Sequence, residues 1–202
     1  MTNYLDMNIQ LYKGKRVLEL GAASSLPSIV ACLNGASFTC STDYPDISVL
    51  ENIKENALIN VPDAYRNGDF QVKGYIWGQK QHTLDDPIAK NESEKYDLIL
   101  MADLIFNHNQ HHQLLQSCRD LLKDDGKCLV TFTHHNPKWV DRDLRFFELC
   151  LEYGFEYVCL FKEKWCPMFV DDVGDEETRS LVFGYQLSKS TTQSTDLAKR
   201  EE

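Results

Sequence analysis

The sequence predicts an α/β protein with a Rossmann-like, seven-stranded, mostly parallel sheet, an antiparallel edge strand and helices on both faces. Strand and helix patterns alternate along almost the whole chain, as they do in proteins of this class. Residues 96–102 are almost continuously apolar, which is typical of a parallel strand covered on both faces. The last two expected strands, 155–161 and 180–187, have no clear helix between them, which favours antiparallel pairing at the edge of the sheet.

Each expected strand is an apolar or alternating segment bounded by turn residues. In chain order, the strands are expected at residues 17–20, 38–42, 69–76, 96–102, 128–133, 155–161 and 180–187. Helices are expected at residues 28–33, 46–60, 111–122 and 139–153. Pro27 is suited to the start of the first helix and Asp46 to the N-cap of the second. The apolar side of the second helix is expected to carry Ile47, Leu50, Ile53 and Leu58. Residues 124–126, Asp-Asp-Gly, predict a turn.

Length and composition indicate one domain, residues 1–187, followed by a polar tail, residues 188–202, that we expect to be disordered. No apolar run approaches the ~20 residues that span a bilayer, and the first residues lack the features of a secretory signal. The seven cysteines are an odd number without a C-x-x-C pair, which favours a reducing compartment. We therefore expect a cytoplasmic protein, without a membrane partner, that is a monomer.

The net charge of −10 disfavours a nucleic-acid partner, because phosphates would repel the protein. The same charge suits a basic partner such as a lysine-rich protein, although many enzymes are acidic without such a partner.

The segment 16–27 contains the most informative motif in the chain. An apolar strand carrying Glu19 ends at Gly21, small residues follow, and a second strand ends at Asp43, twenty-two residues after Gly21. This arrangement is half of a nucleotide-type site. It lacks the G-x-G-x-x-G that a diphosphate requires, whereas an adenosyl ligand without phosphate does not need those glycines. The commonest such ligand is S-adenosylmethionine, so the motif predicts a methyltransferase.

The carboxyl ends of the parallel strands should meet at one rim, where the ligand binds. We expect Asp43 to accept hydrogen bonds from both ribose hydroxyls; the alternative is a capping or turn aspartate. Glu19 is expected to orient the turn or reach the ligand's ammonium group, or else to be a solvated acid. Gly21 allows close approach to the backbone, or serves only as a tight turn. Trp77 either stacks on adenine or belongs to the core.

Asp103 and Phe106 follow the fourth strand. If the reaction is methyl transfer to an amine, Asp103 can orient the amine and Phe106 can form the wall of a narrow channel. The alternative is a solvated acid and a core phenylalanine. The six histidines do not complete an ordered ligand set, so we expect no metal. His134 and His135 are expected to contact the substrate instead.

Several of these segments resemble the seven-β-strand methyltransferases of the family-16, lysine-methyltransferase-like group. They are residues 17–27, 42–45, 74–78, 102–108, 131–137 and 168–179. The resemblance implies that the S-adenosylmethionine pocket is lined by Glu19, Gly21, Asp43, Trp77 and Ala102. Ala22 and Tyr44 lie in the same segments and are expected beside them. The resemblance also implies that residues 103–106 form the group's D-x-x-[FY] motif near the acceptor amine.

The resemblance further implies a protein N-methyltransferase that acts on the N-terminal amine or a nearby lysine of translation elongation factor 1-alpha. Relatives carry a longer segment ahead of the first strand, which here begins about fifteen residues into the chain. We therefore expect the N-terminal lid over the cofactor to be short or missing. Two alternatives stay open: N-methylation of a small molecule such as nicotinamide, and a catalytically impaired module that only binds the cofactor.

Overall fold

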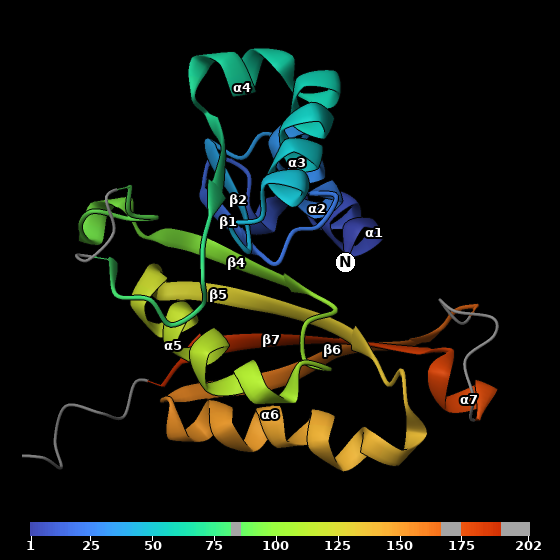
Figure 1. Ribbon diagram of the computed structural model, residues 1–202. Coiled ribbons are helices and arrows are strands. Elements are labelled where there is room, and N and C mark those ends of the chain that lie inside the picture. The colour runs from blue at the N-terminus through green and yellow to red at the C-terminus, as the bar shows by residue number, and fades with distance from the viewer. Residues whose placement is uncertain (82–85, 167–174, 191–202) are drawn as a thin grey trace, which may run out of the picture.

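The structure is a computed structural model that describes residues 1–81, 86–166 and 175–190. It contains one seven-stranded sheet with the order β3-β2-β1-β4-β5-β7-β6 (Figure 1). The strands are β1 Arg16–Leu20, β2 Phe38–Asp43, β3 Phe70–Gly74, β4 Tyr96–Ala102, β5 Leu122–Thr133, β6 Phe155–Lys164 and β7 Leu181–Lys189. Strands β1 to β5 are parallel, and β7 is antiparallel to both of its neighbours. The predicted fold class is confirmed.

One detail of the predicted sheet is wrong. The antiparallel strand is β7, and it lies between β5 and β6 rather than at the edge. The strand at this edge of the sheet is β6, which carries the run Lys162-Glu163-Lys164, and all three residues are exposed. Charged side chains of this kind protect an edge strand from pairing with other chains. The two strands therefore pair with each other as expected, but β7 has a hydrogen-bonded neighbour on each side.

Helices cover both faces of the sheet. Figure 1 shows α5 and α6 on one face and α1, α2 and α3 on the other. The α-helices are α1 Thr2–Met7, α2 Leu26–Leu33, α3 Ile47–Asn60, α4 Pro62–Asn67, α5 His111–Leu121, α6 Val140–Glu152 and α7 Glu176–Arg179. Short 3-10 helices are η1 Ile9–Leu11, η3 Glu92–Glu94, η4 His108–Gln110 and η5 Pro137–Trp139. The short helices α1, α4 and α7 had no clear signal in the sequence.

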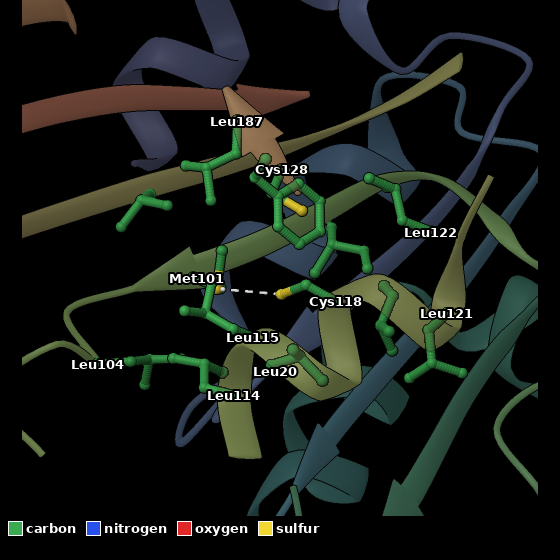
Figure 2. Close-up of a cluster of buried hydrophobic side chains, with 14 of the residues drawn as sticks. Leu20, Met101, Leu104, Leu114, Leu115, Cys118, Leu121, Leu122, Cys128 and Leu187 are labelled. Atoms are coloured by element: carbon green, nitrogen blue, oxygen red, sulfur yellow. Dashed lines mark hydrogen bonds between the residues drawn. The ribbon is translucent and has the colours of Figure 1, made fainter. Parts of the chain in front are cut away.

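The central strand β4 is buried on both faces, as its apolar run predicts. Ile99 and Met101 belong to the core cluster beneath α5 and α6, whereas Leu98 and Leu100 belong to the cluster beneath α1 and α2. In Figure 2, Met101 lies against Cys118 of α5, with 3.5 Å between the two sulfur atoms. All seven cysteines are free thiols.

Two further local predictions need correction. The expected turn at residues 124–126 is a bulge within β5, because Tyr96 pairs with Leu122 and Leu98 pairs with Lys127. The predicted apolar side of α3 is only partly right. Ile53 and Ala57 are fully buried, whereas Ile47 is 75% exposed and Leu58 is 44% exposed. The predicted N-cap of α3 is confirmed, because Asp46 Oδ1 accepts hydrogen bonds from the backbone N–H groups of residues 48 and 49.

The predicted boundary of the domain moves slightly. Strand β7 continues to Lys189, so Ser188 and Lys189 belong to the sheet rather than to the expected tail. Residues 191–202 of that tail, and residues 168–174 of the last motif segment, lie outside the described residues. No helix in the described part of the chain is long and apolar enough to cross a bilayer.

The burial pattern of α3 generates a stability prediction. Ile53→Ala should lower the free energy of unfolding by about 2–4 kcal/mol, because it deletes buried methyl groups and leaves a cavity. Ile47→Ala should change it by less than about 0.5 kcal/mol, because the side chain is exposed. Denaturant unfolding of both variants measures the difference. Equal losses would contradict the assignment of the two faces.

Candidate functional site

A cavity of about 400 Å³ lies at the carboxyl ends of β1, β4 and β5. Its lining includes Glu19, Gly21, Ala22, Ala102 and Asp103, all of which the sequence placed at this rim. Two larger hollows, of about 810 and 660 Å³, are lined mainly by other segments and contain none of the predicted site residues. Ligands of open α/β sheets bind beyond the carboxyl ends of the strands, so the smaller cavity is the candidate site.

The turn after β1 forms one wall of this cavity and has an unusual backbone. Gly21, Ala23 and Ser25 all have positive φ angles, of 64°, 49° and 65°. At Ala23 and Ser25 this conformation is strained, by about 1–2 kcal/mol per residue. Hydrogen bonds compensate for the strain: Ser25 Oγ lies 2.7 Å from Ser41 Oγ, and the Ala22 N–H donates to the Thr42 carbonyl over 3.0 Å.

Gly21 is required at its position by space as well as by φ. A Cβ atom there would lie 2.6 Å from Leu104 Cδ2 and 3.2 Å from Trp77 Cζ2. Trp77 is half-buried and packs against the core, so its ring reaches the turn from the end of β3. The sequence predicts a close approach to the backbone at Gly21. In the structure, the side chains of Leu104 and Trp77 make this approach.

Two asparagines that the sequence analysis missed also hold this turn. Asn52 Nδ2 donates to the Ala23 carbonyl over 3.2 Å, and Asn56 Nδ2 donates to the Ser24 carbonyl over 3.1 Å. Both lie on α3, one helical turn apart, so they share one face. Asparagine is a weak helix former, and its recurrence at i, i+4 within this helix was the available signal.

Glu19 is buried, with 1% of its surface exposed. Its Oε2 accepts a hydrogen bond from the Ser28 N–H, in the first turn of α2, over 3.0 Å. Desolvation raises the pKa of this carboxyl group to about 7, while the bonding to Ser28 opposes the rise. Glu19 is thus not a solvated acid. A buried carboxyl group on the wall of a cavity is suited to a cationic ligand group, because a positive charge would favour its ionised form.

Asp43 joins the turns that follow β1 and β2. Its Oδ2 accepts a hydrogen bond from the Ala23 N–H over 2.8 Å, and its Oδ1 accepts one from the Tyr44 N–H over 2.7 Å. Each carboxylate oxygen has further acceptor capacity, which remains for ligand hydroxyls. Tyr44 is largely exposed beside it. Asp43, Tyr44 and Trp77 lie next to the cavity rather than among its lining residues.

The segments after β4 and β5 form the opposite side of the site. Asp103 has a φ of 59°, and its N–H donates to the Thr131 carbonyl over 2.7 Å. His135 Nε2 lies 3.0 and 2.9 Å from the two oxygens of the Asp103 carboxylate. The rings of His135 and Phe106 meet edge to face, with 5.6 Å between their centroids. Phe106 is 53% exposed, so it is not a core residue.

The two neighbouring histidines take different positions. His135 is half-buried at the rim, whereas His134 is 5% exposed and its Nδ1 lies 2.7 Å from Asp143 Oδ2. Of the expected pair, His135 is therefore the one beside Asp103. The remaining described histidines near the site also have their own partners. Within the described ranges, no group of three or more His, Cys, Asp or Glu residues could hold a metal ion.

Comparison with known proteins places the chain in a family. The family model described as lysine methyltransferase matches residues 1–152. The protein N-terminal and lysine N-methyltransferase EFM7 of Candida glabrata is 44% identical over 185 residues, covering 92% of this chain and 71% of the relative. The EFM7 protein of Candida albicans is 42% identical over 191 residues, covering 92% and 73%. The efm7 protein of Schizosaccharomyces pombe is 35% identical over 190 residues, covering 93% and 73%.

Solved structures with a similar fold include methyltransferases of low sequence identity. Precorrin-6y C5,15-methyltransferase from Geobacter metallireducens has a TM-score of 0.59 at 14% identity, covering 94% of this chain and 86% of the other. P. horikoshii TYW2 in complex with MeSAdo has a TM-score of 0.57 at 16% identity, covering 91% and 61%. The Gly21 turn, the buried Glu19 and the carboxylate of Asp43 fit an adenosyl ligand with a cationic amino-acid end. The chain belongs to the lysine methyltransferase family, and S-adenosylmethionine is its cofactor.

Proposed function

We propose that this chain is a protein N-methyltransferase that modifies the N-terminal amine, a nearby lysine, or both, of translation elongation factor 1-alpha. The observation that carries the proposal is the Asp103–His135 pair, which stands beside the exposed ring of Phe106 at the cavity. The relatives are protein N-terminal and lysine N-methyltransferases, which supports an amine of a protein as the acceptor. The choice of elongation factor 1-alpha rests on the resemblance of the motif segments.

The cofactor-binding residues in this proposal come from the ends of several strands. Asp43 binds the ribose hydroxyls with its remaining acceptor capacity. Glu19 faces the amino group, and Trp77 and Tyr44 flank the adenine. The backbone at Gly21, Ala22 and Ala102 forms the floor between them. When bound, S-adenosylmethionine supplies a sulfonium methyl group, which a neutral amine accepts as the carbon–sulfur bond breaks, leaving S-adenosylhomocysteine.

The acceptor amine must lose a proton before its lone pair can attack. In the proposal, the Asp103 carboxylate accepts a hydrogen bond from the amine and orients its lone pair, while His135 holds the carboxylate from the other side. The proton passes to water, directly or along this pair. The rings of Phe106 and His135 shield the approach of the amine. Orientation of this kind supplies much of the rate acceleration, because the methyl group is already activated.

The surroundings of the proposed site suit this substrate class. The net charge of −10 attracts a basic protein, because electrostatic attraction acts over longer distances than direct contacts. We propose a cytoplasmic location, because seven free thiols are typical of a reducing compartment. We also propose that the protein is a monomer. The same charge works against nucleic acid as a partner.

Methyl transfer to purified elongation factor 1-alpha tests the proposed function. The protein, labelled S-adenosylmethionine and the factor should yield label that survives acid precipitation, and mass spectrometry should locate it on the N-terminal peptide. Asp103→Asn should lower the rate at least about tenfold, because the amide has lost the carboxylate charge. Label recovered only in an acid-soluble product with nicotinamide would instead support a small-molecule enzyme. Cofactor binding without transfer to either acceptor would support a binding module.

Asp43→Ala tests the assignment of the ribose site. The variant should bind S-adenosylhomocysteine at least about tenfold more weakly, because it loses ligand contacts and the bonds that join the two turns. Isothermal titration measures the affinity, and Asp63→Ala, at an exposed position in α4, is the matched control. Unchanged affinity in Asp43→Ala would remove this residue from the site.

Glu19 should make stability fall as the pH rises. Its folded-state pKa of about 7 lies above the ordinary value of 4.5 for a glutamate, so between these values the folded state binds more protons than the unfolded state. Below about pH 4.5 the carboxyl group is neutral in both states. Above that pH the free energy of unfolding falls, and at about pH 7 the loss reaches about 3 kcal/mol. Glu19→Gln should remove this slope in unfolding experiments from pH 5 to 8. Glu51→Gln, on the exposed side of α3, should keep it, and an unchanged slope in Glu19→Gln would contradict the assignment.

A further inference from the structure

A buried carboxylate beneath the rim bonds two histidines at once. Asp143 of α6 is 3% exposed. Its Oδ1 lies 2.6 Å from His108 Nε2, and its Oδ2 lies 2.7 Å from His134 Nδ1. Both distances are those of short, charge-assisted hydrogen bonds. Each imidazole needs only one N–H, directed at the carboxylate, to make its bond, so both oxygens of this buried group are satisfied.

The two histidines belong to the two segments that form the acceptor side of the site. His108 begins η4, two residues after Phe106. His134 is the chain neighbour of His135, which bonds Asp103. Asp143 is therefore a bridge between the segment after β4 and the segment after β5. The contacts close a ring that runs through Asp103, His135, His134, Asp143 and His108 and returns along the chain to Asp103.

Aromatic packing fixes the histidine rings in this bridge. The ring of His134 meets Phe132 and Phe183 at centroid distances of 5.4 and 5.2 Å. The ring of His108 meets His111 and Trp139 at 5.7 and 5.8 Å. Because these neighbours limit rotation, the histidine nitrogens stay directed at Asp143. A shift of α6 would thus be passed to both segments.

We propose that Asp143 is a positioning residue for methyl transfer: it holds the segments after β4 and β5 in register, so that Asp103, His135 and Phe106 meet the acceptor amine together. This inference rests on the proposed function for the identity of the acceptor, but the bridge itself does not. Asp143 touches neither cofactor nor amine. It acts through His134 on His135 and through His108 on the segment that carries Phe106.

Kinetics of Asp143→Asn test the role in catalysis. The amide keeps the shape but carries no charge, and its Nδ2 can only donate. The bridge therefore loses both charge-assisted bonds, and one imidazole keeps a bond only as its other tautomer. We expect kcat to fall about tenfold, because small misplacements of reacting groups are costly. The Kd for S-adenosylhomocysteine and the KM for the protein acceptor should stay within about twofold. Asp141→Asn, exposed in the same turn of α6, is the matched control and should leave kcat unchanged.

A double-mutant cycle separates positioning from general damage. In a His135→Ala background, Asp143→Asn should lower kcat by clearly less than tenfold, because one of the groups that it positions is already absent. A full additional tenfold loss would overturn the proposal, and so would a parallel loss of cofactor affinity in Asp143→Asn alone. If Asp143→Asn does not fold, His108→Asn, at the partly exposed end of the bridge, replaces it, with the same expected loss of kcat and an unchanged cofactor affinity.

A second measurement does not depend on activity. In protein labelled with 15N-histidine and bound to S-adenosylhomocysteine, the ring N–H of His135 that donates to Asp103 should be visible by NMR and assigned by its loss in His135→Ala. Asp143→Asn should broaden or remove this signal, and Asp141→Asn should retain it. An unchanged signal would overturn the bridge. If the unaltered protein transfers no methyl group to elongation factor 1-alpha, the proposed function fails, while this spectrum still decides the role of Asp143.

Discussion

The register of the parallel strands is the constraint on which the site depends. Leu20 of β1 pairs with both Thr42 of β2 and Met101 of β4. The next residue along each strand therefore lies in one row, which brings together Gly21, Asp43 and Ala102. Backbone hydrogen bonds continue this order past the strand ends, from Ala22 to Thr42 and from Asp103 to Thr131. A slip of one residue would turn each side chain to the other face of the sheet. Burial of β4 on both faces opposes such a slip.

Backbone strain is concentrated at this row. Among the described non-glycine residues, only Ala23, Ser25 and Asp103 have positive φ angles, and all three border the site. Such conformations persist where the surroundings over-determine them. Here hydrogen bonds to Ser41 and Asp43 and from Asn52 of α3 hold the turn after β1, and the neighbouring strand holds Asp103. The strain turns the backbone away from the sheet at the ends of β1 and β4, which opens the cavity between them.

The sequence allowed the strands and the acids at their ends to be predicted, because both depend on local patterns. Asp43 and Asp103 each follow an apolar run, and parallel strands place such residues at one edge. The contacts that distinguish His134 from His135 depend on partners far away in the chain. Asp103 is 32 residues from His135, and Asp143 is 35 residues from His108. No periodicity encodes such pairs. The sequence also did not predict that β7 lies between β5 and β6, because strand order depends on long-range pairing rather than on local composition.

The two sides of the site are held by different kinds of interaction. On the proposed cofactor side, backbone N–H groups, the carboxylates of Glu19 and Asp43, and asparagine amides fix the turns after β1 and β2. On the acceptor side, alternating carboxylates and imidazoles join loops that no backbone ladder connects. A backbone ladder is rigid but chemically inert, whereas a chain of carboxylates and imidazoles can also hold or release protons. Methyl transfer to an amine needs a proton to leave only on the acceptor side. In the proposed reaction, these histidines therefore position the amine on the side from which its proton leaves.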